Sequence, residues 1–232
     1  MKKVQKSKIF SLAALAVTAC LITVTGIVFR QPILHILPLY ISLVISLLQS
    51  RGSRTAYLIG AGNALLYGAV CWYFRLYASA VYAVLFSCTI QLATYFLWKK
   101  RPAGNATVFR RLKPRQRAAV GGGFILVGAV VYAVLSAADS SYRFFDIATS
   151  LLGILVSVLA MFAYIEYVPL MIFSQFISIG LYISMMRDAP AQITYLIYTL
   201  FSVVCQFAAL KRVMSLYKEQ MGEKNNETES QL

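Results

Sequence analysis

The sequence predicts an all-α integral membrane protein with eight transmembrane helices, and both its composition and its apolar segments indicate this class. Hydrophobic residues make up 59% of the 232 residues and charged residues 13%, whereas soluble domains carry about 25% charged residues. The mean hydropathy is +0.70. A helix needs about 20 apolar residues to cross the hydrocarbon core of a bilayer. The segments that meet this requirement are 9–29, 33–50, 55–75, 79–98, 118–137, 143–164, 168–186 and 191–211.

The distribution of Lys and Arg between these segments predicts how the protein is oriented. The connection 99–117 alone holds eight of the 22 basic residues and no acid. If the eight segments cross the membrane alternately, 18 basic residues fall on the side of the termini and four on the other side. The four are Arg30, Arg75, Arg143 and Arg187. Short basic connections remain on the cytoplasmic side, so we expect a multi-pass protein of the cell (inner) membrane with both termini in the cytoplasm.

The two ends of the chain are interpreted separately. Lys2 to Lys8 followed by an apolar run resembles a signal peptide, and Val17 to Cys20 resembles a lipoprotein cleavage box. The apolar run extends nine residues beyond Cys20, to Phe29, which favours a retained first helix. At the other end, residues 213–232 are polar and low in hydrophobicity, which predicts a disordered cytoplasmic tail.

Composition disfavours several other function classes. The net charge of +14 lies between the apolar segments, so anionic lipid headgroups are a simpler partner for it than nucleic acid. The four cysteines all lie in apolar segments without a CxxC pair, and a single histidine, His35, does not build a metal cluster. We expect structural roles for these residues and no metal or cofactor. No HExxH, GxSxG or P-loop motif is present, which argues against an enzyme.

Polar side chains recur on single faces of several predicted helices. Within a membrane such groups have to be satisfied by protein or by water, so they mark either hydrogen bonds between helices or a cavity. Amides beside aromatic rings suit an uncharged ring-and-ribose ligand, through edge hydrogen bonds and stacking. The faces are Asn63 and Tyr67; Ser87, Gln91, Tyr95 and Trp98; Asp146, Ser150, Gly153 and Ser157; Gln175, Ser178 and Tyr182; and Tyr195, Tyr198, Ser202 and Gln206.

Acids are scarce in the apolar segments. Asp146 lies near the outer end of its segment, where it suits a helix N-terminal cap, and Glu166 lies at a cytoplasmic end. An ion pathway more often contains buried carboxylates or a relay histidine. A proton- or sodium-driven pump is therefore disfavoured.

Two runs of small residues have structural interpretations. Gly60, Ala64 and Gly68 recur at four-residue spacing, which lets transmembrane helices approach closely. The run Gly121–Gly123 at the start of the fifth segment fits either close packing or a flexible entry to that helix, and the sequence does not separate the two.

Several of these motifs together resemble the PnuC family of vitamin transporters, which is best known for nicotinamide riboside. Asn63 to Gly68 resembles the family's N-x-x-x-Y-G segment, and Gln91 to Lys99 resembles its Gln followed by G-W-Y-x-W-K. In the second half, Asp146, Glu166 and residues 175–182 follow its D…E-x-W…N-x-x-S-I-x-L-Y layout.

The chain also departs from the family's pattern at positions that bear on a ligand pocket. Thr94 replaces a Gly, Val168 replaces a Trp, and Gln175 takes the place of the Asn. A second Trp, one turn before that Asn, is absent, with Met171 or Ile172 in its place. A Gln repositions its amide by one methylene, and the loss of an indole removes a stacking face.

The resemblance covers about residues 33–212 and implies the family's architecture, two parallel three-helix bundles joined by one inversion helix as in SWEET sugar carriers. Parallel repeats of this kind are a known transporter plan. The resemblance also implies a homotrimer. The expected divisions are a cytoplasmic basic N-terminus with an extra helix at 1–32, a first bundle at 33–98, a basic loop at 99–117, a linker helix at 118–137, a second bundle at 143–212 and the tail at 213–232.

The mechanism implied by the resemblance is facilitated diffusion, in which the two bundles rock around a midplane site and phosphorylation in the cytoplasm traps the substrate. Nicotinamide riboside is the leading substrate, and relatives carry thiamine, riboflavin or deoxynucleosides. Two alternatives stay open: a substrate-binding membrane subunit of an ATP-driven vitamin importer, and a structural protein that binds no small ligand. The expected ligand contacts are Asn63, Gln91, Tyr95, Trp98 and Gln175, with Tyr67, Met171, Tyr182 and Tyr198 lining the cavity.

Overall fold

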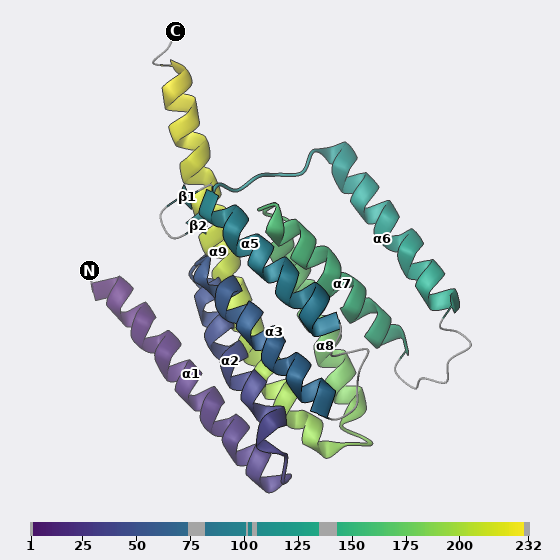
Figure 1. The fold of residues 1–232 in the computed structure, drawn as a ribbon. Helices are drawn as coiled ribbons and strands as arrows, with labels where there is room; N and C mark the ends of the chain where they lie inside the picture. The colour runs from purple at the N-terminus through teal and green to yellow at the C-terminus, as the bar shows by residue number, and fades with distance from the viewer. Residues whose placement is uncertain (1, 74–81, 101, 104–105, 135–142, 230–232) are drawn as a thin grey trace.

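Long helices that run alongside one another make up almost all of the structure (Figure 1). The computed structural model describes residues 2–73, 82–100, 102–103, 106–134 and 143–229. Within the described residues, each of the eight predicted apolar segments overlaps a helix, so the all-α class is confirmed, with one hairpin of two-residue strands added. The elements are α1 (Lys2–Val28), α2 (Ile33–Ser50), α3 (Thr55–Tyr73), the π-helix η1 (Tyr82–Cys88) continued by α5 (Thr89–Lys100), β1 (Pro102–Ala103), β2 (Ala106–Thr107), α6 (Pro114–Val134), α7 (Arg143–Met161), α8 (Tyr167–Met185), and the 3-10 helix η3 (Pro190–Gln192) continued by α9 (Ile193–Glu229).

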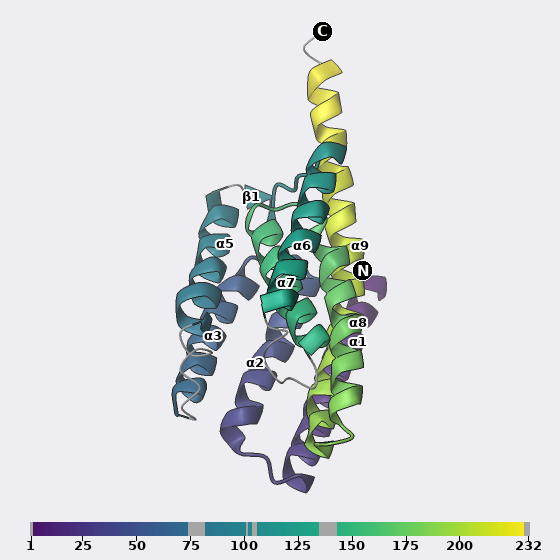
Figure 2. The ribbon, with the colours of Figure 1, turned by 90° about the vertical axis from the view of Figure 1, so that its right-hand side faces the viewer.

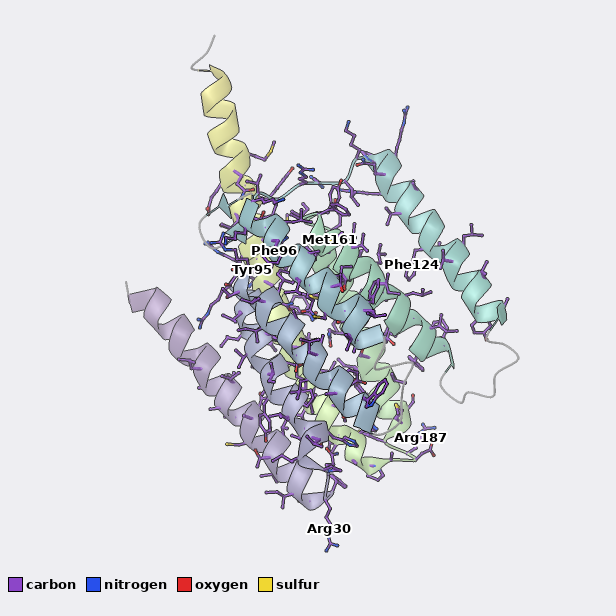
Figure 3. All side chains as sticks on the ribbon, viewed as in Figure 1. Arg30, Tyr95, Phe96, Phe124, Met161 and Arg187 are labelled. Carbon is purple, nitrogen blue, oxygen red and sulfur yellow. The ribbon has the colours of Figure 1, made fainter. Side chains whose placement is uncertain are left out.

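The bundle has two distinct ends, which are named here by their charges. The basic end holds Lys99 and Lys100 at the close of α5 and the connection that leads into α6. The opposite end holds the turns between α1 and α2 and between α8 and α9, where Arg30 and Arg187 lie (Figure 3). α1 and α6 flank the remaining helices on opposite sides (Figures 1 and 2).

An aromatic core, formed by Tyr57, Trp98, Phe109 and Tyr167, fills the bundle near the basic end. The Trp98 side chain is 1% exposed, and its Nε1 donates a hydrogen bond of 2.8 Å to the Ala160 carbonyl. The Trp98 ring centroid lies 4.8 Å from that of Tyr57, 5.5 Å from Phe109 and 6.5 Å from Tyr167, all in edge-to-face contacts. Such pairs add stability beyond the area they bury, so this cluster holds α3, α5, α7 and α8 together.

The turn between α7 and α8 is tied to the basic connection that precedes α6. Ala163 in this turn has a φ of 59°, which is costly for a residue with a side chain. Two backbone hydrogen bonds hold it: the Arg110 N–H donates to the Ala163 carbonyl at 2.8 Å, and the Ile165 N–H donates to the Arg110 carbonyl at 2.9 Å. Arg117 of α6 also pairs with Glu166 at 2.8 Å.

At the opposite end α1 is attached to α2 and α9. Gln31 Nε2 donates to the Ala191 carbonyl at 2.7 Å, and the Thr194 hydroxyl donates to that of Thr25 at 3.0 Å. The hydroxyls of Thr23 and Tyr40 lie 2.6 Å apart. The extra N-terminal helix is therefore packed onto the other helices rather than detached from them.

The C-terminal segment differs from the sequence prediction. We expected a disordered tail from 213, but α9 continues to Glu229. Val213 is fully buried and Leu216 is 8% exposed, both packed in the same cluster as the aromatic core. These two apolar side chains, which lie within two turns after the predicted end of the helix, extend the packing of α9 against the bundle.

Three helical stretches in the described part of the chain are long and apolar enough to cross a membrane by length and composition. They are Ile33–Ser50, Tyr167–Met185 and Pro190–Gly222. Leu12–Val28 and Ile147–Met161 are apolar but shorter.

Candidate functional site

A cavity of about 410 Å³ lies among α2, α3, η1, α5, α8 and α9. Its residues come from the first half of α2, the middle of α3, the end of α8 and the start of α9, which places it away from the basic end. None of the described lining residues is Asp, Glu, Lys or Arg. The lining consists of His35, Pro38, Leu39, Ser42, Ile45, Gly60, Asn63, Ala64, Tyr67, Ser87, Gln91, Tyr182, Tyr195 and Tyr198.

Asn63 joins α3 to α2 at the cavity wall. Its Nδ2 donates to the Ser42 hydroxyl at 3.0 Å and to the Pro38 carbonyl at 3.4 Å. Pro38 lies inside α2, where proline cannot donate the usual backbone hydrogen bond. The Oδ1 of Asn63 is buried and has no hydrogen-bond partner among the described residues. A buried acceptor of this kind costs about 1–3 kcal/mol when unsatisfied, so it is suited to a donor on a ligand.

Gln91 is the second carboxamide at the cavity, and its position depends on a glycine. Its Nε2 donates to the Gly60 carbonyl at 3.1 Å and to the Ser87 hydroxyl at 3.3 Å. A Cβ atom at Gly60 would overlap Oε1 of Gln91. Gly60 therefore lets the amide lie directly against the backbone of α3. The π-helix η1 ends three residues before Gln91, and π-helical segments are frequent at functional sites.

Tyrosines from three helices supply the aromatic part of the lining. The rings of Tyr182 and Tyr195 are stacked, with centroids 5.8 Å apart and planes inclined by 25°. The Tyr198 hydroxyl lies 3.4 Å from that of Ser46. Tyr67 is 49% exposed. The cavity thus offers ring faces and hydroxyls beside its two amides.

The structure brings five of the nine predicted site residues to this cavity, namely Asn63, Tyr67, Gln91, Tyr182 and Tyr198. The other four lie outside its lining. Trp98 is part of the aromatic core, and Tyr95 and Met171 pack against that same cluster; Figure 3 shows Tyr95 on α5. Seven residues of helix span about 10 Å, so Trp98 is displaced from Gln91 toward the basic end although both share one face. Gln175 is half-buried on α8.

Several lining residues were not among those predicted from the sequence as site residues. His35 was interpreted as structural because one histidine cannot build a metal site, yet it lines the cavity. Gly60 was interpreted as a helix-packing residue. Ser87 and Tyr195 lie on the predicted polar faces, one turn from Gln91 and Tyr198. Their spacing in the sequence would have been enough to predict them as lining residues.

Other members of the predicted polar faces hydrogen-bond within their own helices. The Ser157 hydroxyl donates to the Gly153 carbonyl at 2.7 Å, and the Ser178 hydroxyl to the Ser174 carbonyl at 3.0 Å. For these two serines the interpretation as structural hydrogen bonds is sufficient. Gln206 Nε2 donates to the Ser202 hydroxyl at 3.1 Å, but its Oε1 is buried without a partner among the described residues. The side chains of Asp146 and Ser150 lie outside the described part.

Comparisons with known proteins agree with this geometry. The model of a family described as nicotinamide mononucleotide transporter matches residues 32–211. A solved structure described as the crystal structure of the vitamin B3 transporter PnuC has a TM-score of 0.73 and 18% identity, covering 90% of this chain and 92% of that chain. At this identity the likeness shows the fold alone. No curated protein matches the chain. From the family match, the chain belongs to the nicotinamide mononucleotide transporter (PnuC) family and is a membrane transport protein, not an enzyme.

Proposed function

We propose that the protein carries a small ribosylated ring compound across the cell (inner) membrane by facilitated diffusion, with nicotinamide riboside as the leading substrate. The observation that carries this proposal is the cavity of about 410 Å³, in which two carboxamides lie beside four tyrosines. Its volume falls within the range of about 300–1,000 Å³ usual for ligand sites. Family membership and the vitamin B3 transporter among solved structures point to the same substrate class.

The chemistry of the lining suits a riboside better than a nucleotide. The pyridinium ring of nicotinamide riboside is positively charged, and the faces of tyrosine rings attract cations. Ribose hydroxyls or the ligand's amide supply donors for Asn63 Oδ1, which has no partner among the described residues. A phosphate group is usually held by Arg or Lys, and the described lining has neither. Thiamine, riboflavin and deoxynucleosides are the alternative substrates.

Transport is proposed to occur by rocking of two bundles, α2–α3–α5 and α7–α8–α9, with α6 as the linker and α1 as an extra helix. The aromatic core links these bundles at the basic end, since Trp98 of α5 donates to Ala160 of α7, while the cavity lies toward the opposite end. With the basic end in the cytoplasm, this arrangement corresponds to a state closed to the cytoplasm. Opening of the basic end would release the substrate, and phosphorylation would trap it.

We propose that the other four predicted contacts touch the substrate in the state that opens to the cytoplasm. They are Tyr95, Trp98, Met171 and Gln175. Tyr95 and Met171 pack against the core cluster at the basic end. A substrate that moves from the cavity toward the cytoplasm passes this level of the bundle. We also propose eight membrane crossings, both termini in the cytoplasm and a homotrimeric assembly.

The test uses the purified full-length chain. Its thermal stability is measured with nicotinamide riboside, thiamine, riboflavin, adenosine, deoxyadenosine and sucrose, because a ligand of the folded state raises apparent stability by RT ln(1 + [L]/Kd). The chain alone is then reconstituted in liposomes for uptake. Stabilisation with uptake supports the proposal. Stabilisation without uptake indicates a binding subunit that needs partners, and the absence of both from folded protein overturns the function.

A further inference from the structure

A second cavity, of about 500 Å³, lies between α6 and the pair α7 and α8, apart from the candidate site. Its walls are formed by apolar side chains, among them Phe124 of α6, Leu155 of α7 and Phe173 of α8. Apart from Gly121, the described lining residues that are not apolar are Arg117 and Glu166, which pair with each other near the basic end. This cavity, called the α6 groove here, is chemically unlike the tyrosine-lined site.

The groove exists because α6 stands at the edge of the bundle and carries glycine at its wall. Figure 1 shows α6 outside α7, on the side away from α1. A Cβ atom placed at Gly121, Gly122 or Gly123 meets no atom within 4 Å. The glycine run is therefore not a close-packing seam within the chain. At Gly121 it leaves the groove wall without a side chain.

The mouth of the groove has excess positive charge. The segment 99–117 carries eight basic residues and no acid, so Glu166 offsets only one of them. Lys113, the residue before α6, is exposed, and its carbonyl accepts from the Arg117 N–H at 3.0 Å, so it lies about one turn before Arg117 on the same side of the helix. An apolar groove with a cationic mouth matches a molecule that has an apolar chain and an anionic head.

We propose that the α6 groove binds an anionic phospholipid. One acyl chain lies along α6, α7 and α8, and the phosphate headgroup lies against Lys113. Basic residues near a membrane surface attract anionic lipids. A second copy in the same orientation would place its own basic segment 99–117 at this mouth, so an anionic headgroup is the better match for this groove, and the proposed trimer would form through other faces. The proposal requires the membrane placement but not the substrate proposed above.

Native mass spectrometry of the full-length protein tests the proposal, with phosphatidylglycerol and phosphatidylcholine of identical acyl chains as probes. We expect phosphatidylglycerol to be retained at least about fivefold better than phosphatidylcholine. Gly121→Leu fills the groove and should lower retention of phosphatidylglycerol by at least about fivefold. Gly123→Leu is the matched control, because it also meets no neighbour but is not in the groove lining, and it should retain the lipid.

A second variant tests the headgroup contacts without filling the groove. Lys113→Gln should remove most of the preference for phosphatidylglycerol and leave retention of phosphatidylcholine unchanged. Equal losses in the two glycine variants, or no preference between the two lipids in the unaltered protein, would overturn the proposal. A change of subunit number in Gly121→Leu at unchanged lipid retention would assign the groove to a second copy instead.

Discussion

The two carboxamides at the cavity differ in how much hydrogen-bonding capacity they leave for a ligand. Asn63 uses its Nδ2 on Ser42 and Pro38, and its Oδ1 is buried without a partner in the described residues. Gln91 is bound through Nε2 to Gly60 and Ser87. Both amides are therefore held in position by their N–H groups. The oxygen of Asn63 remains as a buried acceptor without a partner in the described part of the chain, and that of Gln91 lies against Gly60 at the cavity wall. A substrate rich in O–H and N–H donors meets this arrangement directly.

Replacement of Gln91 tests this residue-scale interpretation. Gln91→Ala should weaken binding of nicotinamide riboside at least tenfold, about 1.4 kcal/mol, because it removes an oriented acceptor from the cavity. Calorimetric titration of the folded variant measures the change. Gln49→Ala is the matched control, since this half-buried glutamine on α2 does not line the cavity, and its effect on affinity should be small. Unchanged affinity in Gln91→Ala would assign Gln91 to helix packing.

Gly60 offers a more conservative test of the same contact. In Gly60→Ala the new methyl group overlaps Oε1 of Gln91, and the flexible amide turns away from the Gly60 carbonyl. We expect a loss in substrate affinity of about 1 kcal/mol, the usual net value of one hydrogen bond.

The control for this variant is Gly62→Ala, whose methyl group meets nothing within 4 Å. Each replacement gains about 0.5–1 kcal/mol of helix propensity, but only Gly60→Ala also displaces the Gln91 amide, so substrate affinity is the quantity that is compared. Equal affinities in both would mean that the position of the Gln91 amide is unimportant for binding.

At the scale of elements, the aromatic core determines how α5 meets α7. Trp98 is the centre of three edge-to-face contacts and donates to Ala160 on the other helix. Trp98→Ala should lower the free energy of unfolding by about 3–5 kcal/mol, as for large aromatic residues in a packed core. Trp98→Phe keeps most of the packing and should lose only about 1 kcal/mol, from the hydrogen bond.

The free energy of unfolding of both variants is measured by titration with a denaturing detergent. Ligand titration then measures their affinity for the substrate. Because Trp98 lies outside the cavity lining in the state closed at the basic end, and Phe keeps an aromatic ring for the state that opens there, affinity for nicotinamide riboside should change little in Trp98→Phe. A large fall in affinity at unchanged stability would instead support Trp98 as a direct ligand contact, as the family resemblance implies.

Helix positions were predictable because each apolar segment is bounded by charged or turn-forming residues. The sequence predicted 33–50 for α2, and the helix spans Ile33–Ser50. The sequence predicted less well which residues of a polar face line the cavity and which pack against other helices. Gln91 and Trp98 share a face, but the sequence does not say at which level along the bundle a cavity opens and at which level side chains pack. That depends on neighbouring helices, which brought His35 into the lining and Trp98 into the core.

The end of α9 illustrates a second limit. The segment after Lys211 is rich in polar and charged residues and poor in apolar ones, a composition that predicts disorder. Its few apolar residues nevertheless fall at helical spacing, and Val213 and Leu216 are buried against the core cluster. Average composition does not reveal this stripe, because only one face of the segment is apolar.

At the scale of the whole molecule, the distribution of charge predicts which end faces the cytoplasm. With the native cysteines replaced, single cysteines are introduced at Arg30 or Arg187 at one end and at Arg111 or Arg115 at the other, all exposed positions. A membrane-impermeant maleimide added to intact cells should label the first pair. It should label the second pair only after the membrane is permeabilised, because the basic connection stays inside. The reverse pattern would overturn the proposed orientation.

The same labelling reports on access to the cavity. Tyr67 lines it and is 49% exposed, so Tyr67→Cys should react from outside in the state that is closed at the basic end. Saturating nicotinamide riboside should slow that reaction, since a bound ligand occupies the space beside the residue. Arg30→Cys, beyond the lining at the same end, is the control and should react at the same rate with and without ligand. Equal slowing at both positions would mean that the ligand changes the whole outer face instead of filling this cavity.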